Sequence, residues 1–175
     1  MPLSAFKRTA KKFGFSKHLG VLAAVIPLSV MPQSAKAALS IVVSGTVDLN
    51  FGTMTETGGG GTMVVDTTGA RTPTGAVTAV AGGGLASQGI FSVSGSTGLA
   101  IDVSMTAAAF TVSNGGGATM VVNNFNLVTN AGGATRTITL AANPSTFPLG
   151  ATLNVGAGQA AGTYIGNYTI NANYQ

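Results

Sequence analysis

The sequence predicts an all-β domain of antiparallel strands, a sandwich or a barrel, on three observations. Residues after position 37 are rich in Thr and Val, which favour strands, and in Gly and Asn, which favour turns. Apolar and polar residues alternate with a period of two in several segments, and no segment has apolar residues at helical spacing. Glycine clusters and single prolines separate the segments at intervals of about ten residues, as in sandwiches and barrels.

The alternating segments give the strands in order. The alternation is clearest in five segments, which are residues 41–51, 99–106, 121–127, 137–140 and 164–174. Weaker strands are predicted at residues 62–66, 75–80, 89–94, 110–113 and 149–155. Turns or connections are predicted at Gly58–Gly61, Gly82–Gly84, Gly115–Gly117, Gly132–Gly133, Pro73, Pro144 and Pro148. Because each clear strand has one apolar and one polar face, we expect sheets with a solvated outer surface.

Residues 1–37 have the order of a secretory signal peptide. Five basic residues precede the apolar run Leu19–Met31, and Ala35, Lys36 and Ala37 then supply a small-residue cleavage signal. The apolar run is shorter than the roughly 20 residues that a membrane-spanning helix needs. We therefore expect an exported chain, cleaved after Ala37, that folds as a single domain over residues 38–175.

Cleavage at this point reverses the charge of the protein. The full chain has a formal net charge of +4. Residues 38–175 have a net charge of −2, because they contain two arginines and four carboxylates, which are Arg71, Arg136, Asp48, Glu56, Asp66 and Asp102. This balance argues against a nucleic-acid partner.

Residues 38–175 contain no His, Cys, Lys or Trp. This removes the commonest activated nucleophiles and the imidazole and thiolate ligands of zinc and copper. Asp48 and Asp102 are predicted on outward strand faces, and Glu56 and Asp66 at a loop, rather than in a pocket. Arg71 follows Asp66 across a short turn, so we expect a local surface ion pair worth about 0–1 kcal/mol. We predict a non-enzymatic protein with no catalytic, cofactor-binding or metal-binding residues.

Several short motifs occur in a characteristic order along the domain. They are Asp48 to Gly52 (DLNFG), Gly69 to Arg71 (GAR), Thr74–Gly75, Phe91 to Gly95 (F-x-V-x-G), Thr119 to Phe125 (T-M-x-V-N-x-F), and Gly162 to Tyr174 (G-T-Y-x-G-x-Y-x-I-x-x-x-Y). Together they are spread over nearly all of residues 38–175. The ordered set resembles the bacterial domain of unknown function 4402 family, whose members are similar to chaperone–usher fimbrial, pilin-like subunits.

The resemblance implies an immunoglobulin-like antiparallel β-sandwich that lacks one strand and receives it from a neighbouring subunit, which is donor-strand complementation. The implied partners are other copies of the chain or related subunits, a periplasmic chaperone and an outer-membrane usher. The implied location is the periplasm in transit, then the cell surface or the exterior. The candidate donor face is Ile41, Val43, Gly45, Val47 and Leu49, and the candidate acceptor-groove strand carries Tyr164, Tyr168, Ile170 and Tyr174.

Two questions stay open at this point. Only ten residues separate Ala38 from Asp48, so the stretch Ile41–Phe51 is either a donated strand or the first strand of its own domain. The function alternatives to a fibre or coat subunit are a monomeric secreted β-sandwich that binds a glycan or a host protein, and a small outer-membrane β-barrel.

Overall fold

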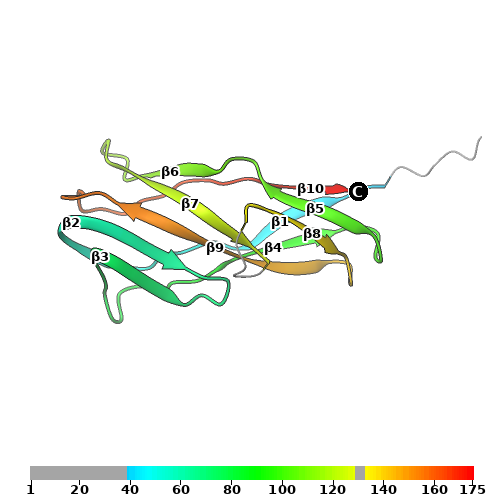
Figure 1. Cartoon of the computed structure of the whole chain (residues 1–175), viewed down its shortest axis with the longest axis horizontal. Helices are drawn as coiled ribbons and strands as arrows, with labels where there is room; N and C mark the ends of the chain where they lie inside the picture. Colours follow the sequence, from blue (N-terminus) through cyan, green and yellow to red (C-terminus); the bar gives the residue numbers. More distant parts are fainter. Residues whose placement is uncertain (1–38, 129–132) are drawn as a thin grey trace, which may run out of the picture. The chain divides into compact units, whose positions relative to one another are not determined.

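The computed structural model describes residues 39–128 and 133–175, and the predicted signal peptide lies outside the described residues. The described part consists of β-strands joined by turns (Figure 1). The strands are β1 (Val42–Val47), β2 (Met54–Val65), β3 (Arg71–Ala79), β4 (Gly89–Ser94), β5 (Ala100–Met105), β6 (Ala109–Ser113), β7 (Thr119–Leu127), β8 (Thr135–Thr139), β9 (Ser145–Val155) and β10 (Ile170–Tyr174). Among these residues there is no helix that could cross a membrane.

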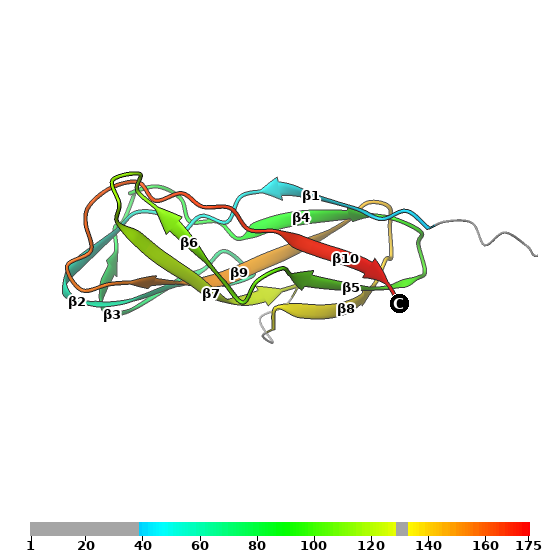
Figure 2. The same ribbon diagram turned by 90° about the horizontal axis from the view of Figure 1, so that it is seen from above.

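The strands form two antiparallel sheets. The larger sheet has seven strands and follows the order β1-β4-β9-β2-β3, while β7 also pairs with β9, and β6 with β7. The smaller sheet has three strands in the order β10-β5-β8. The first half of β9 pairs with β4, and its second half pairs with both β2 and β7, so β9 connects most of the larger sheet. Figures 1 and 2 show the smaller sheet lying against β1, β4 and the start of β9.

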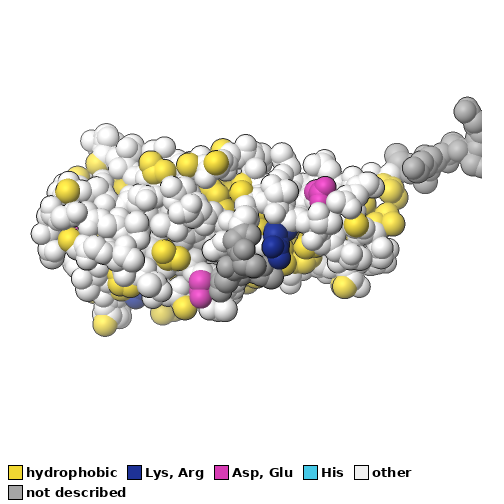
Figure 3. All heavy atoms as spheres, viewed as in Figure 1, with side chains coloured by type: hydrophobic (Ala, Val, Ile, Leu, Met, Phe, Trp, Pro, Cys, Tyr) yellow, Lys and Arg dark blue, Asp and Glu magenta, His cyan; other side chains and the backbone are white. Residues whose placement is uncertain are grey.

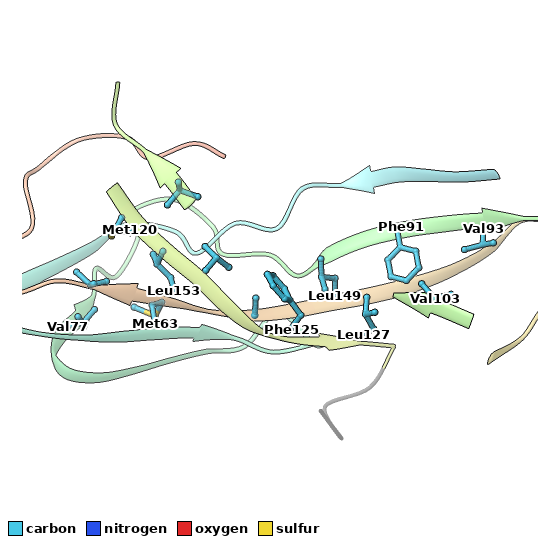
Figure 4. Packing of buried hydrophobic residues seen from close by; sticks show 14 of the residues in the cluster. Met63, Val77, Phe91, Val93, Val103, Met120, Phe125, Leu127, Leu149 and Leu153 are labelled. Carbon is cyan, nitrogen blue, oxygen red and sulfur yellow. The ribbon is translucent and has the colours of Figure 1, made fainter. Parts of the chain in front are cut away.

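Both sheets contribute to one apolar core, which confirms the predicted all-β sandwich. Ile101 and Val103 of the smaller sheet are fully buried in the same cluster as Val93 and Leu149 of the larger one. Figure 4 shows this row of side chains between the ribbons, from Met63 and Val77 at one end to Phe91 and Val93 at the other. The alternation of buried and half-buried residues along β4 matches the period of two seen in the sequence. In β7 the alternation changes phase: Val122 is buried and Val121 is exposed, the reverse of the predicted faces, and the register with β9 shifts between Asn123 and Asn126.

The glycine run Gly58–Gly61 lies within β2, so the turn predicted there is wrong. The register between β2 and β3 shifts between Glu56 and Gly61, and this bulge takes up the additional residues. Gly58 and Gly60 have φ angles of +99° and +67°, which residues with a Cβ rarely adopt. At Gly61, an added Cβ would overlap the carbonyl oxygen of Thr74 on the neighbouring strand. These glycines therefore serve a bulge and a close strand approach, which composition alone does not distinguish from a turn.

Two of the three prolines predicted in connections lie inside strands. Pro73 is in β3, an outer strand of the larger sheet, where a missing N–H group is tolerated. Pro148 is in β9, and its carbonyl accepts a hydrogen bond from the Val128 N–H (2.9 Å). Pro144 precedes β9 in a connection, as predicted, and the clusters Gly82–Gly84 and Gly115–Gly117 also lie between strands.

The two ends of the domain are less regular than the sequence predicts. A register shift between Gly45 and Val47 interrupts the predicted continuous face of the first strand, and Val47 pairs with Ile90 and is 39% exposed. The predicted last strand is regular only as β10. Before it, Ile165 forms an isolated bridge with Ser113 at the end of β6.

Candidate functional site

A groove of about 1240 Å³ runs between the first and last segments of the domain. One wall is formed by residues between positions 43 and 56, and the other by residues 159–170, which lead into β10. Figure 2 shows the two segments, cyan and red, running alongside each other. The floor is apolar and is formed by core side chains, which are Phe91, Phe110, Val112, Met120, Leu153 and Val155.

The strand edges beside this groove are unprotected. β1 pairs only with β4 and β10 only with β5, so each is the outer strand of its sheet. Their sequences, VVSGTV and INANY, contain no charge and no proline. The outer strands at the opposite ends of the two sheets carry Arg71 and Pro73 in β3 and Arg136 in β8. Charges and prolines are devices that keep an edge from pairing with another chain, and the two edges at the groove lack both.

The first strand is held loosely. Val42 is 58% exposed and points away from the core, and no residue of β1 is fully buried. Ile41 and Val43 are half-buried and pack against the core, and the Ser44 hydroxyl hydrogen-bonds to the Ser92 hydroxyl at 2.8 Å. β1 is therefore attached along one edge by a short ladder and a few apolar contacts.

Gly45 leaves open space beside the backbone of the first strand. It is paired with Phe91, which is 2% exposed, so it lies on the inner face of β1. A Cβ added at Gly45 would have nothing within 4 Å. By contrast, the backbone at Gly166 in the opposite wall lies so close to β6 that an added Cβ would be 2.6 Å from the Thr111 carbonyl oxygen. The first strand thus has room for a side chain at Gly45, whereas the last segment has none at Gly166.

Tyr168 lines the groove and contacts the aromatic part of its floor. Its ring lies 5.7 Å from that of Phe110, which in turn stacks on Phe125 at 5.5 Å. Burial raises the pKa of the Tyr168 hydroxyl, the negative charge of Asp48 raises it further, and a hydrogen bond with the Leu49 backbone opposes the shift. Tyr168 therefore faces the chain that follows β1, and it joins the two walls.

The other predicted acceptor residues occupy different positions along the groove. Tyr164 and Ile170 line it with Tyr168. The Tyr164 hydroxyl donates to the Ala160 carbonyl (2.6 Å) and accepts from the Gln159 side-chain amide (2.7 Å). Tyr174 lies beyond the lining residues, where its hydroxyl contacts the start of the first strand. The structure thus brings three of the four residues together in one wall.

Glu56 lines the groove and connects two glycine-containing segments, a role that the sequence did not reveal. Its carboxylate accepts backbone hydrogen bonds from Gly58 (2.5 Å), Gly60 (2.8 Å) and Gly158 (3.1 Å). The bond from Gly60 contributes most to lowering the pKa of Glu56, desolvation opposes it, and the bonds from Gly58 and Gly158 add to the lowering. Glu56 therefore joins the bulge of β2 to the turn after β9. In the sequence, this role was indicated by Gly58 and Gly60, which follow Glu56 by two and four positions.

The remaining charged groups serve local structure. Asp102 accepts hydrogen bonds from the Thr137 hydroxyl (2.5 Å) and the Gln175 amide (3.0 Å). The Asp66 carboxylate accepts from the backbone of its own turn, and Arg71 donates to the carbonyls of Thr53 (3.1 Å) and Val80 (3.4 Å). Figure 3 shows few charged side chains on the face it presents. Across residues 39–128 and 133–175, His, Cys, Asp and Glu form no group of three that could hold a metal ion.

These features define an antiparallel β-sandwich domain with a groove that has an apolar floor and lies between two open strand edges. The chain belongs to a family described as a domain of unknown function (DUF4402), whose family model matches residues 41–174. Among curated proteins and among solved structures, none is significantly similar to the chain. The family match begins at Ile41 and ends at Tyr174, so it includes both walls of the groove.

Proposed function

We propose that the chain is a non-enzymatic structural subunit of a bacterial surface fibre or coat, and that copies assemble by donating the first strand. The segment Ile41–Leu49 of one copy leaves its own sheet and enters the corresponding place in the next copy. The observation that supports this proposal is the groove between two uncharged, unpaired strand edges, one of which is the loosely held first strand itself.

Once the first strand has left, its place and the groove form one slot between β4 and the last segment. An entering strand finds the open edge of β4 on one side and that of β10 on the other. Backbone pairing with a sheet edge gives affinity, and alternate side chains that reach the floor give specificity. The segment suits this slot because Ile41 and Val43 alternate with Val42 and Ser44, which face outward.

The energies involved are of a scale that permits exchange. Full burial of an Ile, Val or Leu side chain stabilises by about 1.5–3 kcal/mol. Ile41, Val43 and Leu49 are only half-buried, so together they stabilise the attached strand by roughly half of that sum, about 2–5 kcal/mol. The same contacts form again in the second copy, as in domain swapping, so exchange loses none of them. The hinge is the irregular stretch between β1 and β2, which contains Gly52 at φ +69°.

Export and the surface location are part of the same proposal. The signal-peptide pattern of residues 1–37 supports export, and the resemblance to fimbrial subunits supports a chaperone, an usher and other subunits as partners. The non-enzymatic part is supported by the carboxylates, since Glu56, Asp66 and Asp102 are all engaged in hydrogen bonds that hold turns and strands.

The test is deletion of residues 38–47 from the domain, followed by addition of a peptide of that sequence. We expect the truncated protein to be less stable, the peptide to restore its stability, and a peptide with Val43→Asp to fail. In addition, the full protein should run as a ladder on unheated denaturing gels and collapse to one band on boiling. A truncated protein that stays fully stable and ignores the peptide, together with a monomer under all conditions, would refute the proposal. That outcome would favour a monomeric sandwich that binds a glycan or a host protein.

A further inference from the structure

The hydroxyl of Tyr174 connects three parts of the chain. Tyr174 is the last residue of β10, where its backbone pairs with Ile101. Its hydroxyl accepts a hydrogen bond from the Ser96 N–H (2.6 Å) and donates one to the Ser40 carbonyl (3.2 Å). Ser96 belongs to the turn after β4, and Ser40 lies two residues before the first strand. One side chain of the smaller sheet therefore holds the beginning of β1 to the larger sheet.

The turn after β4 is shaped to receive this hydroxyl. A Cβ added at Gly95 would overlap the Tyr174 hydroxyl and would lie 3.1 Å from a methyl group of Leu140. Gly95 is held in place by a hydrogen bond from its N–H to the Asn143 side chain (3.3 Å). The tyrosine ring thus fits a space that only glycine leaves open.

The contact lies at the end of β1 from which the strand would detach. The ladder of β1 begins with the pair Val42 and Ser94, two residues from both Ser40 and Ser96. Figure 2 shows the start of β1 and the end of β10 at the same end of the sandwich. Further along, β1 has β4 as its ladder partner and the open groove on its other side. A strand end that is fixed there cannot fray, whereas a free end opens the ladder one pair at a time.

We infer that Tyr174 is a latch that sets how readily the first strand is released. It is a positioning residue, since it acts on the segment that would be exchanged through Ser40 and Ser96. Its consequence for assembly rests on the proposed function: an intact latch keeps β1 in its sheet, and loss of the hydroxyl speeds exchange between copies. The effect on release itself is independent of any polymer.

The test is hydrogen exchange of residues 39–47 in the exported protein and in Tyr174→Phe, compared in the same assembly state. Removal of the hydroxyl takes away the hydrogen bond that holds the Ser40 carbonyl, so we expect exchange of this segment to accelerate by about 2- to 10-fold. Exchange of β2 and β9 should be unchanged. The control is Thr137→Val in β8, because that hydroxyl also donates one hydrogen bond, to Asp102, and accepts one, from the Gln175 side chain, but lines neither the groove nor the first strand.

A second variant disturbs the same contact without changing Tyr174. Gly95→Ala places a methyl group where the hydroxyl lies, so it should accelerate exchange of residues 39–47 with Tyr174 itself intact. Unchanged exchange of this segment in Tyr174→Phe would overturn the inference, as would acceleration spread equally over both sheets. Acceleration confined to residues 39–47, with no multimer formed by any variant, would uphold the latch and refute the fibre proposal.

Discussion

Alanine at Gly45 should stabilise the domain, which is the opposite of the usual effect of adding a side chain to a packed sandwich. Gly45 lies in β1 opposite Phe91, its φ is not positive, and an added Cβ meets nothing within 4 Å. Replacing glycine at such a position restricts the unfolded chain and raises the free energy of unfolding by about 0.4–1 kcal/mol. With a urea dependence of about 2 kcal/mol per molar, the unfolding midpoint rises by roughly 0.2–0.5 M.

The matched variant is Gly150→Ala in β9, where the same methyl group has no space. Its Cβ would lie 2.7 Å from the Val65 carbonyl oxygen and 2.9 Å from the carbonyl carbon of Asp66. Overpacking of this kind costs about 1–3 kcal/mol, so the midpoint should fall by roughly 0.5–1.5 M. Urea titrations of both variants, monitored by circular dichroism, show whether each substitution raises or lowers the unfolding midpoint. A midpoint for Gly45→Ala at or below that of the unmodified protein would refute the conclusion that Gly45 has open space for a side chain.

Three further predictions concern the core and the two shifted pKa values. Leu149→Ala removes a fully buried side chain of β9 and should lower the free energy of unfolding by about 2–5 kcal/mol, measured by urea titration. The pKa of Glu56 is lowered in the folded state, so its contribution to stability is complete above the ordinary value of 4.5 and is lost as the pH falls below it. In Glu56→Gln, the urea unfolding midpoint should therefore fall less steeply as the pH is lowered below 4.5 than in the unmodified protein. The pKa of Tyr168 is raised, so its contribution is complete below 10.0 and is lost as the pH rises above it. Asp48→Asn should shift the absorbance titration of Tyr168 to lower pH, and an unaltered titration would contradict the assigned role of the Asp48 charge.

The sequence was sufficient to predict the all-β class and most of the strands, because one face of most strands is buried. β4 was predicted with its observed bounds, and β5, β6 and β7 to within two residues, since apolar residues alternate throughout β4 and β5 and over parts of the other two strands. The glycine run in β2 was misassigned because glycine permits both a turn and a close approach of backbones, and only the position of Thr74 decides between them.

The groove was less accessible to sequence reasoning than the strands beside it. The tyrosines of the last segment are separated by even numbers of residues, which indicated that they share one inner face. Tyr164, Tyr168 and Ile170 do line the groove. The bulge after Gly45 could not be predicted, because it depends on how β1 pairs with β4, which is a long-range contact. The same holds for the contact between Tyr174 and Ser40, which are separated by 134 positions in the chain.

The placement of the two arginines has a consequence for digestion by proteases. Across residues 39–175, Arg71 and Arg136 are the only sites at which an enzyme of trypsin-like specificity could cut. Both lie in strands with a hydrogen-bonded neighbour, Arg71 opposite Val65 and Arg136 opposite Val103. Because such enzymes require an unpaired, extended substrate, cleavage must wait until β3 or β8 detaches from its sheet, so the rate of nicking reports the opening of these two strands.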